Sequence, residues 1–116
     1  MDAKEYQNMA SEFATYGRNP MYPLFGLAEE AGEVCGKVAK HIRKHNGLLP
    51  LPPNVGGPLD VGFRNDIAKE LGDCLWMIAA ICTDYGLDLG SVMEQNIAKL
   101  KDRKARGVIL GEGDNR

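Results

Sequence analysis

The sequence predicts an all-α protein whose four main helices form an antiparallel bundle. Apolar residues recur at intervals of three and four, which is the spacing of amphipathic helices. Capping residues and glycines separate these stretches. One stretch, residues 74–82, is apolar on nearly all sides, which is typical of a buried helix. The chain has 116 residues, so we expect residues 1–116 to form a single domain.

The first helix is expected over residues 2–16. Asp2 and Glu5 have the spacing of a capping box, and Gly17 follows as a terminating glycine. Its apolar positions are Tyr6, Met9, Ala10, Phe13 and Ala14.

The second helix is expected to begin near Pro23 and to end at about Lys44, and it carries the acidic sequence EEAGE at residues 29–33. Residues three apart lie on one face of a helix, as Glu30 and Glu33 do here. Both flank the expected apolar stripe, and Glu29 points further away. The stripe consists of Leu24, Leu27, Ala31, Val34, Cys35, Val38 and Ile42.

A long loop is expected at about residues 45–64, because its prolines and glycines exclude regular structure. Three roles are open for this loop: a lid over a ligand, an oligomer contact or a tolerated insertion. His41 and His45 precede it, four residues apart on one helical face. That spacing can bind a metal, but without a third ligand we interpret both histidines as surface residues.

The third helix is expected over residues 65–85. Glu70 and Asp73 share one side of it with Asp66, and the other side is apolar: Ile67, Leu71, Leu75, Ile78 and Cys82. This helix is more apolar than three neighbours in one small chain would cover. We therefore expect a homo-oligomer, either a dimer or a dimer of dimers (a homotetramer).

The fourth helix is expected to start at an Asp88 cap and to end near Arg106. Asn96, Lys99 and Arg103 lie along one side, and the inward residues are expected to be Leu89, Val92, Met93, Ile97 and Leu100. The glycine-rich tail, residues 107–116, is expected to be flexible; it either folds back over the site or frays.

The two acidic segments predict a metal site. Carboxylates gathered near a core repel one another, so they must protonate or share a cation. Oxygen ligands without histidine or cysteine nearby favour Mg²⁺, with Mn²⁺ possible. The expected metal ligands are Glu30, Glu33, Glu70 and Asp73. The alternative is that these are ordinary solvated acids on amphipathic helices.

The order of three motifs, EExxE, then ExxD, then NxxKLxxR, resembles the MazG-like all-alpha nucleoside triphosphate pyrophosphohydrolases. The resemblance extends from about residue 6 to residue 106. It implies Mg²⁺-dependent hydrolysis of (deoxy)nucleoside triphosphates to monophosphate and pyrophosphate, as in house-cleaning of the nucleotide pool. The fourth helix resembles the family's basic phosphate-binding helix.

Within this resemblance each polar residue has an expected role. Lys99 and Arg103 would hold the phosphates, Asn96 would reach the sugar or base, and Glu29 is a candidate for orienting or deprotonating the attacking water. Trp76 lies one turn beyond Asp73, where stacking on a base is possible, but a place in the core is favoured.

Two alternative functions remain open. The first is a phosphoribosyl-ATP pyrophosphohydrolase, which has closely similar motifs. The second is a non-catalytic helical interaction module whose acids bind a structural ion.

Composition narrows the class of protein. The net charge of −2 gives no indication of nucleic-acid binding, and no apolar run is long enough for a membrane span. The N-terminus is polar and unlike a signal peptide. The three cysteines are unclustered on apolar segments, which is typical of reduced core cysteines. We therefore expect a cytoplasmic protein.

Overall fold

The computed structural model describes residues 1–48 and 51–116 of the chain. In these residues it forms four α-helices and one short 3₁₀ turn, and no strand: α1 (Ala3–Ser11), α2 (Met21–Lys44), η1 (Pro53–Val55), α3 (Val61–Asp84) and α4 (Leu89–Ala105). The prediction of an all-α chain with four main helices is confirmed. Leu49 and Pro50, within the expected loop, lie outside the described residues. None of the helices described combines the length and the apolar character that a membrane span requires.

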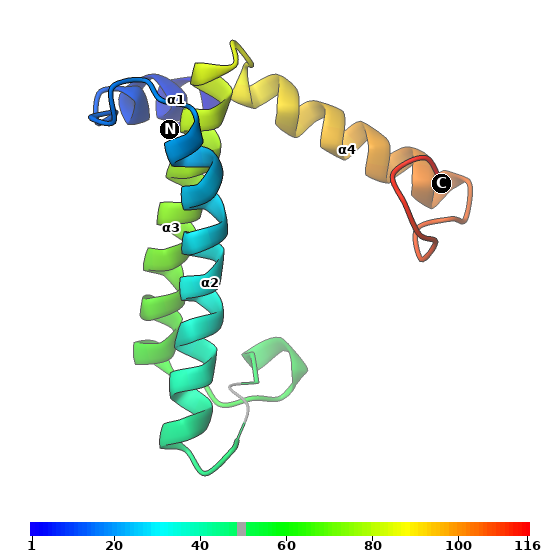
Figure 1. Ribbon diagram of the computed structural model, residues 1–116. Helices are drawn as coiled ribbons and strands as arrows, with labels where there is room; N and C mark the ends of the chain where they lie inside the picture. Colours follow the sequence, from blue (N-terminus) through cyan, green and yellow to red (C-terminus); the bar gives the residue numbers. More distant parts are fainter. Residues whose placement is uncertain (49–50) are drawn as a thin grey trace.

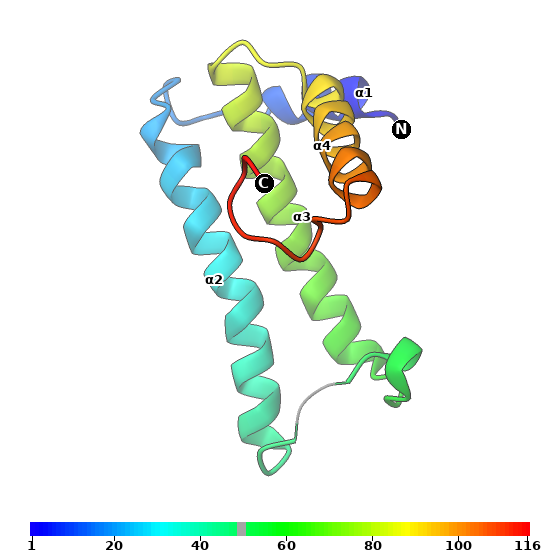
Figure 2. The same ribbon diagram turned by 90° about the vertical axis from the view of Figure 1, so that its right-hand side faces the viewer.

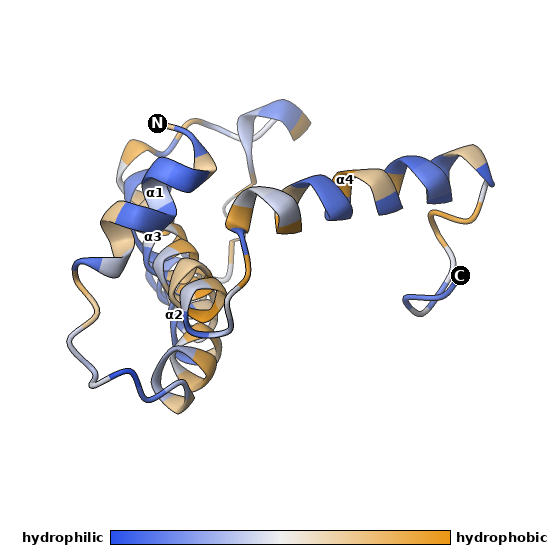
Figure 3. Cartoon of the chain, turned by 90° about the horizontal axis from the view of Figure 1, so that it is seen from above, coloured by the Kyte–Doolittle hydropathy of each residue, from blue (hydrophilic) through white to orange (hydrophobic). Residues whose placement is uncertain are grey.

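The longest helices, α2 and α3, lie side by side and run in opposite directions (Figure 1). The shorter α1 packs on the C-terminal half of α3, and α4 packs on α1. Beyond its first turns α4 extends away from the α2–α3 pair, as Figures 1 and 3 show; in Figure 2 it points toward the viewer. Within one chain, therefore, the described helices do not form the expected four-helix bundle.

The first helix is shorter than expected, ending at Ser11 rather than Tyr16. The Asp2–Glu5 capping box at its start is confirmed. The early end has a tertiary cause, because Tyr16 contacts the ends of two other helices. Its hydroxyl donates to the Asp84 carboxylate at 2.9 Å, and its ring stacks on Tyr22 with centroids 5.1 Å apart.

The third helix begins at Val61, four residues before the expected start. Asp60 is the cause: its side-chain oxygen Oδ1 accepts a hydrogen bond from the backbone N–H of Phe63 at 2.9 Å and so caps the helix. The preceding loop also contains the turn η1, although its composition was expected to exclude regular structure. Gly57 permits this compact loop, because a Cβ there would lie 2.0 Å from the backbone oxygen of Leu51.

A small core lies where α1, α3 and the start of α4 meet. Its buried members are Ala10, Ala79, Cys82 and Leu89. Gln7 fixes the turn between α3 and α4: its amide nitrogen donates to the Leu87 carbonyl at 2.8 Å, and its amide oxygen accepts from the backbone N–H of Leu89 at 2.8 Å. The Asp88 cap of α4 is confirmed. The direction of α4 is therefore set by its first turn.

Much apolar surface is left uncovered in the single chain. Four residues of α4 that were expected to point inward are 37% to 55% exposed: Val92, Met93, Ile97 and Leu100. Figure 3 shows hydrophobic and hydrophilic residues side by side along this projecting helix. The radius of gyration is 17.3 Å, against about 13 Å for a compact chain of this length. The accessible surface of 8454 Å² exceeds the roughly 6,200 Å² of a compact monomer of this mass by about a third.

Candidate functional site

The two long helices face each other through their acidic sides. On α2, Glu30 and Lys37 are half-buried toward α3, whereas Leu24, Ala31 and Cys35 of the expected apolar stripe are exposed. On α3, Glu70 is half-buried, and the expected apolar side is divided: Leu71 and Leu75 are 54% and 42% exposed, whereas Ile67, Ile78 and Cys82 are partly or fully buried. The apolar sides of these helices are therefore covered only in part within one chain. Val34, Val38 and Ile42 do lie partly buried as expected.

Three carboxylates converge between these helices. Glu30 of α2 and Glu70 and Asp73 of α3 each offer one oxygen, and these oxygens all lie within 4.8 Å of one another. Glu70 and Asp73 are one turn apart on α3, and Glu30 faces them from the antiparallel partner. The donors are all carboxylate oxygens, which is the ligand set that hard divalent ions prefer.

Two other acids of the EExxE segment lie outside this group. Glu33 is one turn beyond Glu30 on α2 and is exposed, and its oxygen is not among those that converge. Glu29 is also exposed and lines a shallow pocket with Tyr22 and Phe25 near the start of α2.

The cluster concentrates negative charge. Burial raises the pKa of the Glu30 carboxyl, and the neighbouring charges of Asp73, Glu29, Glu70 and Glu33 raise it further. Each anion therefore makes it harder to ionise the next, and a divalent cation would relieve this repulsion.

The Lys37 ammonium partly neutralises the negative charge of the cluster. Its ammonium lies 3.2 Å from a Glu70 carboxylate oxygen, and the hydrogen bond with Glu70 raises the Lys37 pKa. The observed partner belongs to α3, and only the pairing of the two helices reveals it.

A close approach of the helices shapes the site. Gly26 lies one turn before Glu30, and a Cβ there would meet the Sδ and Cε atoms of Met77 at 2.7 Å. Met77 is buried one turn beyond Asp73. The first helix also reaches the site: burial and the charge of Asp73 together raise the pKa of Tyr6. Neither Gly26 nor Tyr6 was identified from the sequence, since each acts through a neighbour on another helix.

Trp76 packs in the core. Its indole N–H donates to the Ala10 carbonyl at 3.1 Å, and its ring meets Tyr16 and Tyr22 edge to face. These contacts support the prediction that Trp76 packs with the core rather than stacking on a base.

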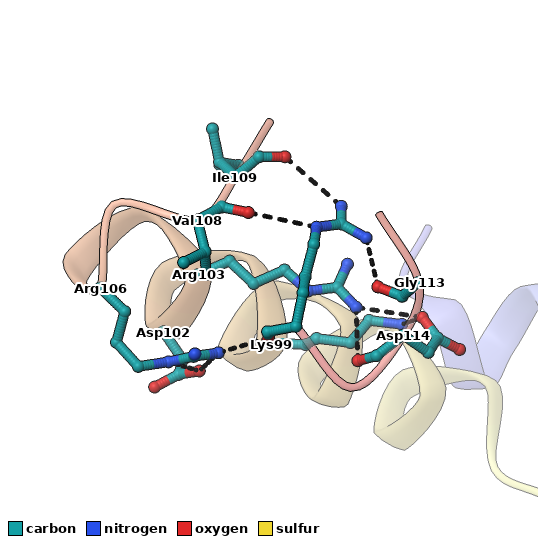
Figure 4. Close-up of polar contacts among 9 residues, drawn as sticks. Lys99, Asp102, Arg103, Arg106, Val108, Ile109, Gly113 and Asp114 are labelled. Carbon is teal, nitrogen blue, oxygen red and sulfur yellow. Dashed lines mark hydrogen bonds and ion pairs between the residues drawn. The ribbon is translucent and has the colours of Figure 1, made fainter. Parts of the chain in front are cut away.

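The basic residues of α4 hold the C-terminal tail. Lys99 lies 3.2 Å from the Asp114 carboxylate, and Arg103 donates to the same carboxylate at 3.0 Å and to the Asp114 carbonyl at 2.8 Å (Figure 4). These contacts lower the Asp114 pKa. Arg103 is only 5% exposed, and its Nε atom has no hydrogen-bond partner among the described residues. Of the two expectations for the tail, folding back is the one observed, but onto α4.

Further contacts brace the tail in this position. Arg106 donates to the Arg116 carbonyl and pairs with Asp102. Arg116 donates to the carbonyls of Val108 and Gly113 (Figure 4).

One chain does not bring the basic residues of α4 to the carboxylate cluster. Lys99 and Arg103 lie in the C-terminal half of α4, which extends away from α2 and α3 (Figures 1 and 3). Asn96 is exposed on the same helix. The residues expected to form one site thus occupy two separate places in the single chain.

Comparison with known proteins supplies the family context. A family model for the MazG nucleotide pyrophosphohydrolase domain matches residues 22–108, which include the carboxylate cluster and the basic residues of α4. The chain is also 35% identical over 119 residues to the Gene 37 protein of Mycobacterium phage L5, and the match covers 96% of each chain. No solved structure matches the chain.

The electrostatics of Glu30 predict a stability effect in metal-free protein. Its folded-state pKa lies above the ordinary value of 4.5, so above pH 4.5 the folded state binds protons more readily than the unfolded state. The free energy of unfolding therefore falls as the pH rises through that window. Glu30→Gln removes this effect. In EDTA at pH 7 the variant should have a higher thermal midpoint than the parent, and the difference should shrink as the pH is lowered to about 4.

The matched control is Glu33→Gln, the same change on the same helix at an exposed position outside the converging oxygens. It should show no comparable gain. A thermal midpoint of Glu30→Gln below that of the parent at pH 7 would contradict the repulsion described here.

Proposed function

The chain belongs to the MazG nucleotide pyrophosphohydrolase family, and from this premise we propose that it hydrolyses (deoxy)nucleoside triphosphates to monophosphate and pyrophosphate. One observation carries the proposal: Glu30, Glu70 and Asp73, from two antiparallel helices, converge within 4.8 Å. A hydrolase of this kind must neutralise a polyphosphate that carries three or four negative charges. A set of carboxylates that can hold divalent ions meets that requirement.

The cluster fits Mg²⁺, and Mn²⁺ as a second choice. The donors are all oxygens, and burial and neighbouring negative charges raise the pKa of Glu30. Glu30, Glu70 and Asp73 would hold the ion, with Glu33 as a fourth ligand from the next turn of α2. The bound ion would supply positive charge against the phosphates and favour ionisation of the attacking water.

The remaining side chains would act on the attacking water and on the substrate. Glu29, the exposed neighbour of Glu30 in the sequence, would orient or deprotonate a water beside the ion. Lys37 is paired with Glu70 and lies at the edge of the cluster, where it contributes positive charge. Lys99 and Arg103 would hold the phosphates, one as a point charge and the other as a planar fork, and Asn96 would contact the sugar or base.

Assembly with a second copy would bring these groups together. The exposed apolar sides of α3 and α4, together with the large radius of gyration, support a homo-oligomer, either a dimer or a dimer of dimers. In such an assembly the projecting α4 of one protomer would reach the cluster of another. Burial of Leu71 and Leu75 at the interface would cover the apolar sides of the paired helices.

The reaction and its metal dependence are tested together. With Mg²⁺ or Mn²⁺ the protein should convert a (deoxy)nucleoside triphosphate to monophosphate and pyrophosphate, and EDTA should abolish turnover. Glu30→Gln, Glu70→Gln and Asp73→Asn should each lose most of the activity, because each deletes a ligand charge and preserves the size of the side chain. Glu33→Gln is expected to lose activity as well.

Glu94→Gln, at an exposed position on α4, is the matched control and should remain active. Products are separated by anion-exchange chromatography across all canonical NTPs and dNTPs. Diphosphate plus phosphate as products would overturn the reaction assignment. Retained activity in all four variants would overturn the metal site.

The phosphate role of α4 predicts a second set of effects. Lys99→Ala or Arg103→Ala should lower kcat/KM roughly ten- to a hundredfold with unchanged helix content, since a charge-assisted contact to phosphate contributes about 1.5–3 kcal/mol. Loss of tail docking is the competing explanation, because both residues hold Asp114.

Asp114→Ala separates the two explanations, since it releases the tail and keeps both basic residues. The phosphate role predicts that Asp114→Ala retains or gains activity. If Asp114→Ala loses as much activity as Arg103→Ala, the residues of α4 act through the tail.

The proposed oligomeric state is tested by measuring the mass of the protein in solution. Light scattering during gel filtration at micromolar concentration should give two or four times the chain mass of 12.7 kDa. Leu75→Glu should lower the mass toward that of a single chain, because it places a charge in the apolar interface. Lys69→Glu adds a carboxylate at a side chain that is 74% exposed on the same helix, and it should leave the mass unchanged. A single-chain mass for the parent protein contradicts the proposed assembly.

A further inference from the structure

A second group of ligating side chains lies at the far end of the α2–α3 pair. His41 and His45 at the end of α2 and Asp60 at the start of α3 each offer one ligand atom, and these atoms lie within 4.8 Å of one another. From Glu30 to His41 is eleven residues of helix, or about 16 Å at 1.5 Å per residue. The group is therefore distinct from the carboxylate cluster. The sequence gave the two histidines no third ligand, and the fold supplies it from the other side of the loop.

Each side chain keeps one ligand atom free for an ion. The Nδ1 atom of His45 lies 2.8 Å from the backbone carbonyl of His41, which leaves Nε2. In Asp60, Oδ1 accepts the capping hydrogen bond from Phe63, which leaves Oδ2, 3.9 Å from Nδ1 of His41. Ligating histidines commonly use their second nitrogen on a backbone carbonyl in this way, since the contact fixes the ring and its tautomer.

We propose that His41, His45 and Asp60 form a second cation site, specific for Zn²⁺ or a similar transition-metal ion. Two imidazole nitrogens and one carboxylate oxygen suit Zn²⁺, whereas the all-oxygen cluster suits Mg²⁺. Tetrahedral Zn²⁺ with bonds of about 2.0–2.1 Å holds its ligand atoms about 3.4 Å apart. Side-chain rotations would have to bring the three atoms from their present spacing of up to 4.8 Å to that value. The fourth position is left to water.

The surroundings hold the ligands in place. The His41 ring stacks on His45 with centroids 3.9 Å apart and meets the edge of Phe63 at 4.9 Å. Leu51, Pro52 and Leu59 of the loop complete an apolar wall beside both histidines. A bound ion would join the end of α2 to the start of α3 and so close the loop between them.

Two nearby lysines would suit a different ligand, an anion, and the experiment must distinguish anion binding from cation binding. Lys40 and Lys44 line the adjacent hollow with the two histidines. Their positive charge opposes a cation and would suit an anion such as phosphate. The carboxylate of Asp60 within the group favours the cation, because it would repel an anion at that position.

The chain contains only two histidines, so imidazole ligation can be assigned without ambiguity. The full-length protein is titrated with Zn²⁺ in excess Mg²⁺, which keeps the carboxylate cluster occupied, and histidine side-chain NMR is recorded alongside calorimetry. Zn²⁺ should shift the signals of both histidines at one equivalent per chain. Zinc bound by the exposed thiol of Cys35 would leave the histidine signals in place.

The variants are chosen to preserve the fold. Asp60→Asn keeps the helix cap and removes the ligand charge, and His45→Ala changes an exposed residue. Each variant should weaken Zn²⁺ binding at least about tenfold, because even the loss of a residue that only contacts a metal ligand typically costs that much affinity. Asp88→Asn, the same change at the cap of α4, should leave binding unchanged.

Three results would overturn the proposal: no shift of the histidine signals by Zn²⁺, unchanged binding in Asp60→Asn, or a shift of both signals by inorganic phosphate in the absence of Zn²⁺. None of these readouts depends on nucleotide hydrolysis, so failure of this site and failure of the proposed function are distinguishable.

Discussion

The structure depends on negative charge held between two packed helices. Glu30, Glu70 and Asp73 converge where α2 and α3 meet, and Gly26 lets the helices approach closely beside them. Such an arrangement costs free energy, because burial and repulsion both oppose ionisation. The Lys37 ammonium beside Glu70 offsets part of this cost within the chain. Protons at low pH would relieve the remainder, as would the divalent cation of the proposed function at neutral pH.

Placing the acids inward determines the rest of the architecture. Glu30 and Glu70 lie half-buried between the helices, and Leu71 and Leu75, elsewhere on the circumference of α3, lie exposed. The small core around Ala79 and Leu89 covers only one end of the hairpin. The single chain therefore has an extended shape and an uncovered apolar surface. Under the proposed assembly, the orientation of α2 and α3 about their axes has two consequences. It places the carboxylate cluster between the helices, and it leaves the exposed apolar residues for the oligomer interface.

Local signals in the sequence predicted the helices well, because caps act over three or four residues. The Asp2 and Asp88 caps are confirmed, and the four helices exist. The orientation of α2 and α3 about their axes was not predictable from periodicity. Periodicity indicates which residues share one side of a helix, but not which neighbour that side faces. The direction of α4 depends on Gln7, a contact across the fold. Similarly, the third residue beside His41 and His45 follows from the pairing of α2 with α3.

Three internal ion pairs occupy the groups to which the proposed function assigns substrate and metal. The Asp114 carboxylate lies between Lys99 and Arg103, where a phosphate oxygen would bind, and the Lys37 ammonium lies against Glu70, beside the proposed ion. Asp114 is 82% exposed, and exposed pairs contribute only about 0–1 kcal/mol each. Under the proposed function a phosphate would displace the exposed Asp114 carboxylate at little cost, whereas Lys37 and Glu70, whose side chains are 26% and 14% exposed, form a partly buried pair. The same pairs keep the charged groups partly neutralised while no substrate is bound.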